Sequence, residues 1–147
     1  MAFHFVFLSE EFYKDYINCP EIEQKKDRPY ICLLIDIDGM QFAIPLRSHI
    51  HHPHAYLTDP QNQCGVDYSK AIVLKKPEYV DQIRKPFIRP NEFDTLRGKE
   101  HIIEMGMQKY LRAFRKALQS PDVPRNALLL RFSALQYFVE EIQHNQA

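Results

Sequence analysis

The feature that most constrains this chain is a pair of β-rich runs joined by Asp38-Gly39. The runs are Tyr30–Ile37 and Met40–Leu46, and both are rich in aliphatic side chains. Asp-Gly favours a type I′ turn, because both central residues of that turn need a positive φ. This combination is the strongest short signal for a β-hairpin. The hairpin is therefore the expected centre of a small antiparallel sheet.

Further strands are expected on both sides of the hairpin. Aromatic side chains alternate along Phe3–Leu8, which predicts a strand, and Ser9 can cap a short helix that follows it. A continuous apolar run predicts another strand at Ser69–Leu74. The segment between the hairpin and that strand is rich in histidine and is expected to be a loop.

Two long helices are predicted in the C-terminal part of the chain, at Lys99–Leu118 and Asn126–Gln143. Each places its apolar side chains on one stripe, and Pro121 and Pro124 separate them. Three prolines in residues 77–90 leave room only for turns or a short helix. The expected fold class is α+β, a single domain over residues 1–147 with helices packed on the sheet.

Composition excludes several classes of protein. No apolar run approaches the roughly 18 residues that a membrane span needs, and the apolar N-terminus lacks the basic region of a signal peptide. The three cysteines form no CxxC pair, so neither a disulfide framework nor a zinc ribbon is indicated. A cytoplasmic protein without a membrane partner is expected.

The charge of the chain is unevenly distributed, although it sums to zero. Residues 75–116 carry 11 Lys and Arg against 6 Asp and Glu, whereas residues 1–74 carry 6 against 10. Such asymmetry can produce one basic face on a neutral protein. Tyr79, Phe87 and Phe93 interleave with the basic residues and are candidates for stacking on RNA bases. Exposed cations that only solvate the surface are the alternative.

Four histidines lie within six residues, His49, His51, His52 and His54. An imidazole titrates near pH 6.5, so it can donate or accept protons at neutral pH. Metal-free RNA cleavage needs a base, an acid and cationic donors around the phosphate, and this segment can supply them. Two alternatives stay open: a metal site, and an exposed loop without a role. No GxSxG surrounds Ser48, and no phosphate-binding glycine motif occurs.

The order of several segments resembles the toxins of type III toxin–antitoxin systems, the ToxN/AbiQ/TenpN group. The likeness is carried by the opening strand with Ser9, the hairpin Tyr30–Gly39, the strand end Ala43–Ser48, and Gly65 followed by Lys70–Val73. The resemblance implies an endoribonuclease with a twisted antiparallel sheet like the Kid/MazF toxin barrel, flanked by helices. It implies cleavage of target mRNA without metal or other cofactor, leaving a 2′,3′-cyclic phosphate.

The resemblance also implies the partners of the protein. Such toxins are inhibited by a repeat-RNA antitoxin that folds into pseudoknots and assembles with the toxin into closed complexes, and some protect bacteria from phage. No DNA partner is expected. A metal-dependent hydrolase and a non-catalytic RNA-binding module are the alternative functions.

By position, Ser48 falls on the family's active-site serine, Lys70 on a basic position at the start of the next strand, and Arg28 where a family lysine stands. The chain departs from the family at Arg47, where Thr is usual, and in the His-rich segment, which is Lys-rich there. Arg47 and Lys70 are expected to stabilise phosphate, Ser48 to position it, and His49 or His51 to transfer protons. The expected RNA-binding residues are Arg28, Tyr30, His52, His54, Lys75, Lys76, Arg84, Lys85, Arg89, Arg112, Arg115 and Lys116.

Overall fold

A computed structural model describes residues 3–23 and 30–145 as an α+β fold. Its strands are β1 (His4–Phe7), β2 (Ile31–Ile37), β3 (Met40–Arg47), β4 (Ala55–Asp59), β5 (Cys64–Asp67) and β6 (Ile72–Val73). Its helices are α1 (Glu10–Asp15), α2 (Pro90–Leu96), α3 (Glu100–Gln119), α4 (Pro124–Phe132) and α5 (Val139–His144). Short 3-10 turns lie at Tyr68–Lys70, Pro77–Tyr79 and Ala134–Phe138.

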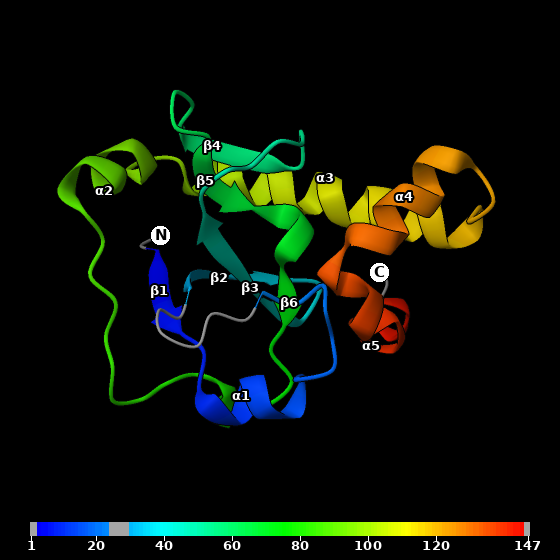
Figure 1. The fold of residues 1–147 in the computed structure, drawn as a ribbon, viewed down its shortest axis with the longest axis horizontal. Helices are drawn as coiled ribbons and strands as arrows, with labels where there is room; N and C mark the ends of the chain where they lie inside the picture. The colour runs from blue at the N-terminus through cyan, green and yellow to red at the C-terminus, as the bar shows by residue number, and fades with distance from the viewer. Residues whose placement is uncertain (1–2, 24–29, 146–147) are drawn as a thin grey trace.

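The strands form one antiparallel, open sheet in the order β1-β2-β3-β5-β4, with β6 also paired to β3 (Figure 1). Strand β3 is therefore the centre of the fold. One of its edges pairs with β2, and its other edge pairs first with β6 and then with β5. This arrangement brings Arg47, the last residue of β3, opposite Gly65 in β5.

The predicted hairpin is confirmed. Asp38 and Gly39 have φ values of 54° and 78°, and Ile37 pairs with Met40 across the turn. The opening strand and its helix are confirmed as β1 and α1, and the Ser9 hydroxyl accepts a hydrogen bond from the Phe12 amide at 3.3 Å. Local turn and capping chemistry dictates both features.

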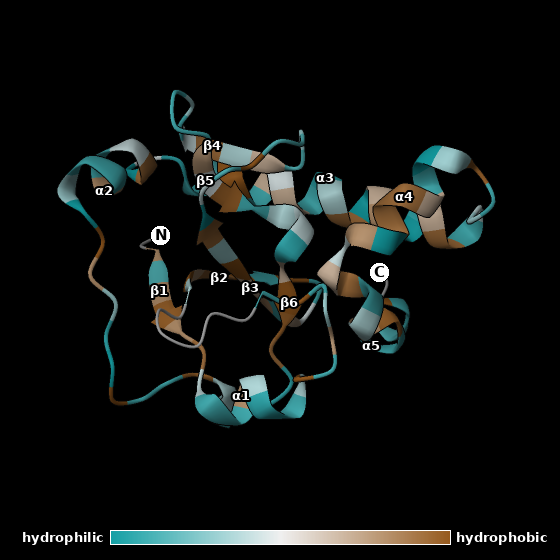
Figure 2. Cartoon of the chain, in the orientation of Figure 1, coloured by the Kyte–Doolittle hydropathy of each residue, from teal (hydrophilic) through white to brown (hydrophobic). Residues whose placement is uncertain are grey.

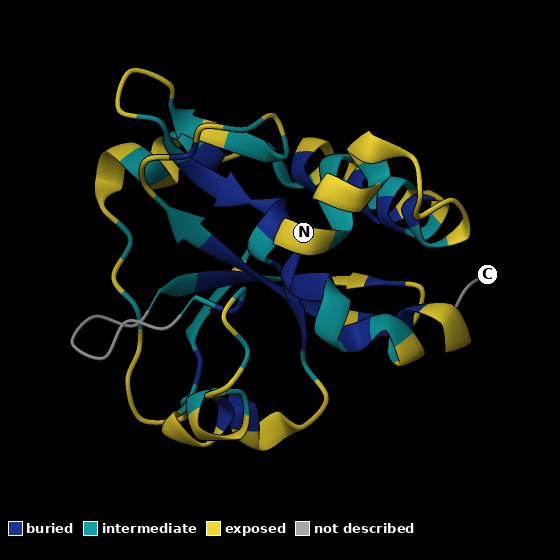
Figure 3. Cartoon of the chain, turned by 45° about the vertical axis from the view of Figure 1, so that its right-hand side comes forward, coloured by how far each residue is buried: buried dark blue, intermediate teal, exposed yellow. Residues whose placement is uncertain are grey.

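The core lies between the sheet and the helices. Helix α3 buries one stripe of side chains, Ile103, Met107, Tyr110, Leu111 and Phe114, as its periodicity predicts. They meet fully buried sheet residues such as Phe42 and Ile44. The buried inner strands and half-exposed helices are visible in Figure 3, and the apolar residues follow the same layer in Figure 2. Burial of each such side chain contributes about 1.5–3 kcal/mol.

The expected strand at Ser69–Leu74 is wrong in its first half. Residues Tyr68–Lys70 form a 3-10 turn, because the Asp67 carboxylate accepts a hydrogen bond from the Ser69 amide and caps that turn. Only Ile72 and Val73 pair with β3, at Ala43 and Phe42. The turn directs Ser69 and Lys70 away from the sheet ladder.

The expected single helix at Asn126–Gln143 is also wrong, because the chain breaks at Ser133. Helix α4 ends there, a 3-10 turn follows, and α5 begins at Val139. Ser133 has an extended backbone, and its buried hydroxyl accepts a hydrogen bond from the Leu135 amide at 3.2 Å. Serine hydroxyls compete in this way with helical hydrogen bonds.

The histidine-rich segment contains a hairpin, β4–β5, where a loop was expected. The two strands pair from Ala55 with Asp67 to Asp59 with Cys64. Gly65 allows the close approach, since an added Cβ would lie 2.7 Å from the Leu57 Cα. The hairpin extends the sheet and fixes the position of the histidines that precede it.

No helix of the described residues is long and apolar enough to cross a membrane.

Candidate active site

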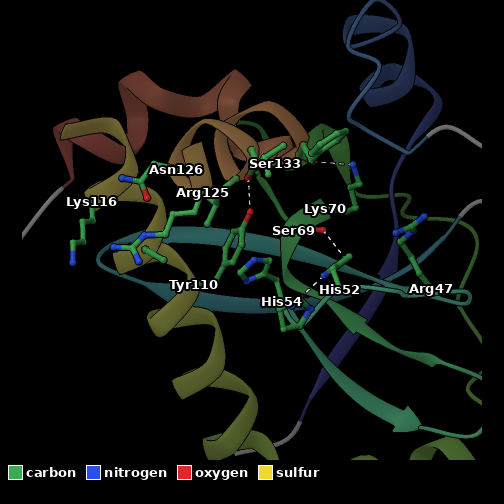
Figure 4. A pocket seen from close by; sticks show the side chains of 15 residues that line it. Arg47, His52, His54, Ser69, Lys70, Tyr110, Lys116, Arg125, Asn126 and Ser133 are labelled. Atoms are coloured by element: carbon green, nitrogen blue, oxygen red, sulfur yellow. Dashed lines mark hydrogen bonds between the residues drawn. The ribbon is translucent and has the colours of Figure 1, made fainter. Parts of the chain in front are cut away.

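A pocket of about 670 Å³ opens where the end of β3 and the Tyr68–Lys70 turn face α3 and α4. Figure 4 shows His52, His54 and Tyr110 in the middle of the row of labelled side chains, with Arg47 at one end and Lys116 at the other. The full lining is Arg47, His52, Pro53, His54, Ser69, Lys70, Tyr110, Ala113, Lys116, Arg125, Asn126, Leu128, Leu129, Phe132 and Ser133.

The pocket wall carries cations and no carboxylate. Among the described residues that line it, Arg47, Lys70, Lys116 and Arg125 are basic and none is Asp or Glu. A second hollow, of about 510 Å³, is lined by Asp36, among other residues, and carries two further carboxylates on α3. Like charges repel, so the first pocket is the one that favours an anion.

A buried carboxylate organises the floor of the pocket. Asp67 is fully buried, and it accepts hydrogen bonds from Arg47 NH1 at 2.6 Å and from the Ser69 hydroxyl at 2.6 Å. His52 Nε2 lies 3.2 Å from one of its oxygens and 3.2 Å from the Ser69 hydroxyl. Burial alone would raise the pKa of Asp67, but these hydrogen bonds outweigh burial and lower that pKa below its usual range.

The hydrogen-bond partners of its two ring nitrogens favour one tautomer of His52. The backbone amide of His54 donates to Nδ1 of His52 at 3.0 Å, so Nδ1 carries no proton when this bond is made. The ring proton is then on Nε2, facing Asp67 and Ser69. Both nitrogens of His52 are thus engaged, and the residue positions its neighbours.

His54 has the environment of a proton-transfer group. Its ring is half-buried, 5.3 Å from the Tyr110 ring and 5.8 Å from the His52 ring. Within residues 3–23 and 30–145, no hydrogen bond engages its ring nitrogens. Burial, and then the nearby His52, lower the pKa of His54 below its ordinary value. The imidazole is therefore neutral at neutral pH and can accept a proton.

Lys70 has two hydrogen-bond partners among the described residues. Its ammonium donates to Glu21 Oε2 and to the Phe132 carbonyl, both at 2.9 Å. An ammonium has three donors, so within this part of the chain one N–H is left for a ligand. Arg47 differs, because Asp67 and Glu23 occupy both of its terminal nitrogens.

Tyr110 ties the pocket to the helix break at Ser133. Its hydroxyl donates to the Ser133 hydroxyl at 2.7 Å, and both residues are buried. Burial raises the pKa of Tyr110 above its usual range, so the phenol stays protonated. The bond fixes the start of the segment after α4 against α3, and so it fixes one wall of the pocket.

The structure brings together some of the predicted site residues. Arg47 and Lys70, and also His52, His54 and Lys116, line the pocket. Ser48, His49 and His51 are exposed on the turn after β3 and do not line it. Ile50, buried between the two histidines, anchors that turn through its amide, which donates to the Gln63 carbonyl at 3.0 Å.

Most of the other predicted RNA-binding residues lie away from the pocket. Four of them form ion pairs, Lys75 with Glu141, Arg84 with Asp81, Arg89 with Glu92 and Arg115 with Asp38. Lys76, Lys85 and Arg112 are exposed, Tyr30 is half-buried, and Arg28 falls outside the described residues. Among the candidate stacking residues, Phe87 and Phe93 are exposed but Tyr79 is buried and cannot stack on a base.

Several pocket residues were not predicted from the sequence. They are Ser69, Tyr110, Arg125, Asn126, Phe132 and Ser133. Asp67, which bonds to Ser69 but does not itself line the pocket, was not predicted either. One local signal could have identified Asp67. It precedes Ser69 by two residues, a spacing at which an Asp side chain can accept a hydrogen bond from the backbone amide. The others reach the pocket only through the packing of α3 and α4.

The histidine run does not gather into a metal site. Across the described ranges, no three His, Cys, Asp or Glu side chains converge so that they could hold an ion. His49 and His51 face solvent while His52 and His54 contact the pocket, so the run is split between two environments.

No protein-family model, curated protein or solved structure matches this chain.

Proposed function

We propose that the protein is a metal-independent endoribonuclease whose active site is the pocket around His54. The observation that carries the proposal is the half-buried imidazole of His54 in a pocket lined by four cations and, among the described residues, by no carboxylate. A phosphodiester is the anionic substrate class that such a combination suits, because its cleavage needs both proton transfer and charge stabilisation.

His54 takes the proton of the ribose 2′-OH. The 2′ oxygen then attacks phosphorus, the bond from phosphorus to the 5′ oxygen breaks, and the leaving oxygen receives a proton from the Lys70 ammonium. The products are a 2′,3′-cyclic phosphate and a 5′-OH. His54 and Lys70 regain their starting protonation states from water. This assignment moves proton transfer to His54 from His49 and His51, which are exposed.

The free N–H of Lys70 also stabilises the charge of the pentacoordinate phosphorus, and such donors are effective because they are already oriented. Arg47, Asp67, Ser69 and His52 act as positioning residues. Their hydrogen bonds hold the segment from His52 to His54 at the end of the sheet. Ser48 follows Arg47 in the chain, is exposed and does not line the pocket, and it is proposed to orient the RNA strand outside the pocket.

The likeness to type III toxins supports the same proposal and extends it. On that basis the protein is a toxin that cuts mRNA in the bacterial cytoplasm, is inhibited by its own repeat-RNA antitoxin in a closed complex, and acts in phage defence. On the same basis, we propose that the sheet corresponds to the twisted sheet of the Kid/MazF toxin barrel.

The experiment that tests the proposal is cleavage of a mixed RNA pool in excess EDTA by the wild type, His54→Ala and Ser48→Ala. The proposal expects cutting by the wild type and cutting about 10²–10⁴-fold slower by His54→Ala. Binding without cutting would favour a non-catalytic RNA-binding module. Cutting only after a divalent metal is restored would favour a metal-dependent hydrolase.

A further inference from the structure

We infer that the α3–α4 end of the pocket is a separate subsite for one unstacked nucleotide of the RNA, which holds its base against α4 and its phosphate on Arg125 and Lys116. The inference rests on the proposed function, because it names the recognition element of the same site. It concerns binding, so it can be tested without any cleavage.

The apolar wall of this subsite comes from a helix that buries none of its residues. In α4, Leu128 and Phe132 are 56% and 51% exposed, yet both line the pocket, together with Leu129. Large apolar side chains rarely cluster at a pocket unless a ligand covers them. Phe132 offers a ring on which a base of any sequence can stack.

The cations of the subsite are free to bind a phosphate. In the part of the chain that the structure describes, no ion pair engages Lys116 or Arg125, whereas Arg47 and Lys70 are both paired. Figure 4 places Lys116 and Arg125 on the opposite side of Tyr110 and His54 from Arg47 and Lys70. The pocket thus has cations at both ends, with the candidate base, His54, between them.

A nucleotide fits this arrangement better than another anion. The pocket volume, about 670 Å³, lies within the range of small-molecule sites. Asn126 lies at the same end, and its side-chain amide donates to the Ser120 carbonyl at 3.0 Å, while no described residue bonds to its side-chain oxygen, which can read the edge of a base. An apolar wall, a polar reader and two unpaired cations match the base, base edge and phosphate of one nucleotide.

The test measures binding of short 2′-O-methyl oligonucleotides, which lack the attacking hydroxyl and cannot be cut by the proposed route. The probes are homopolymers of A, C, G and U and an abasic strand with the same phosphates. The proteins are the wild type, Phe132→Ala, Arg125→Ala and a control, Phe87→Ala, which removes an even more exposed ring outside the pocket.

The expected result is that Phe132→Ala weakens binding of at least one homopolymer about tenfold, in line with base–aromatic stacking, and leaves the abasic strand unaffected. Arg125→Ala should weaken both kinds of strand, and Phe87→Ala neither. Equal affinity of the wild type and Phe132→Ala for every homopolymer would overturn the inference, as would a wild type that binds none of them.

The cleavage assay separates this inference from the proposed function. RNA cutting in EDTA that Phe132→Ala leaves unchanged in rate and cut site would contradict the subsite while the ribonuclease stands. Base-dependent binding that needs Phe132, without cutting of ribose-containing RNA, would uphold the subsite and contradict the ribonuclease.

Discussion

The backbone amide of His54 donates a 3.0 Å hydrogen bond to the ring Nδ1 of His52. Because Asp67 and Ser69 face the other ring nitrogen, His52 links a fully buried carboxylate to the backbone of its neighbour two residues later. The position of the His54 ring, which closes one side of the pocket against Tyr110, depends on this link.

Replacing His54 should remove proton transfer and leave the fold intact. His54→Ala is expected to lower the cleavage rate constant about 10²–10⁴-fold, the usual contribution of a general base. In the wild type the rate should fall as the pH drops through the His54 pKa, which burial and His52 lower and Asp67 partly restores. This acidic limb should lie below pH ~6.5, the ordinary value, and should be absent from the residual activity of the variant. Rate–pH profiles check both, and a limb that persists in His54→Ala would assign it to another group.

The two conservative replacements of His52 should have different effects. In His52→Asn, the side-chain oxygen can take the place of Nδ1 and accept from the His54 amide, but the donor to Asp67 is lost. In His52→Gln, the side-chain nitrogen can take the place of Nε2 and donate to Asp67, but the acceptor for the His54 amide is lost. Each should cost about 1–3 kcal/mol in the free energy of unfolding, because each removes one hydrogen bond, either to the buried Asp67 carboxylate or from the His54 amide.

In activity, His52→Gln should lower kcat more than His52→Asn, since it releases the backbone of His54. Neither replacement should abolish the acidic limb of the rate–pH profile, whereas His54→Ala should abolish it. Urea unfolding and steady-state kinetics on the same samples measure both effects. A loss of the limb in His52→Asn would indicate that His52 itself transfers the proton.

Asp67→Asn should destabilise the protein by about 3–5 kcal/mol at neutral pH, because it leaves the half-buried Arg47 without its closest partner. The pKa of Asp67 is lowered in the folded state, so its contribution is present above the ordinary pKa and is lost as the pH falls through the folded one. Urea unfolding between neutral and strongly acidic pH should show a smaller loss of stability in Asp67→Asn than in the wild type and in Asp94→Asn, an exposed control, because other carboxylates with lowered pKa values remain in all three.

Gly65→Ala should damage the fold and the site together. The added methyl group would collide with the backbone of Tyr56 and Leu57, and Gly65 is paired with Arg47 on the other side. We expect a loss of about 1–3 kcal/mol in the free energy of unfolding, as for other overpacked positions. Thermal unfolding measures it, with Cys64→Ala, which is half-buried, as the control. An unchanged midpoint would show that β4 can move without cost.

The sequence predicts those parts of the fold that depend on local chemistry. The hairpin at Asp38-Gly39 and the cap at Ser9 are examples, since the turn and the capping hydroxyl act on neighbouring residues. The break at Ser133 could not be predicted, because apolar periodicity continues across it from Phe132 to Leu135 and its hydroxyl is bound by Tyr110, 23 residues away. The hairpin β4–β5 was hidden because its strands are short and weakly apolar and follow a histidine-rich stretch.

The candidate site shows the same division. Arg47, Lys70 and the histidines could be identified because residues with useful chemistry lie close together in the sequence. Which histidine faces the pocket depends on Ile50, whose burial places His49 and His51 on the outside. Arg125 and Phe132 enter the pocket only because α4 turns back along α3, and no short sequence pattern indicates that contact.

The most direct test of the account is a single-turnover assay in EDTA on an RNA oligonucleotide that contains one mapped cut site, compared with the same strand carrying a 2′-deoxy sugar there. We expect the wild type to cut the ribose strand to a 2′,3′-cyclic phosphate and to leave the deoxy strand intact, and we expect His54→Ala to cut the ribose strand about 10²–10⁴-fold more slowly. Equal cutting of the two strands, or full activity in His54→Ala, would contradict it.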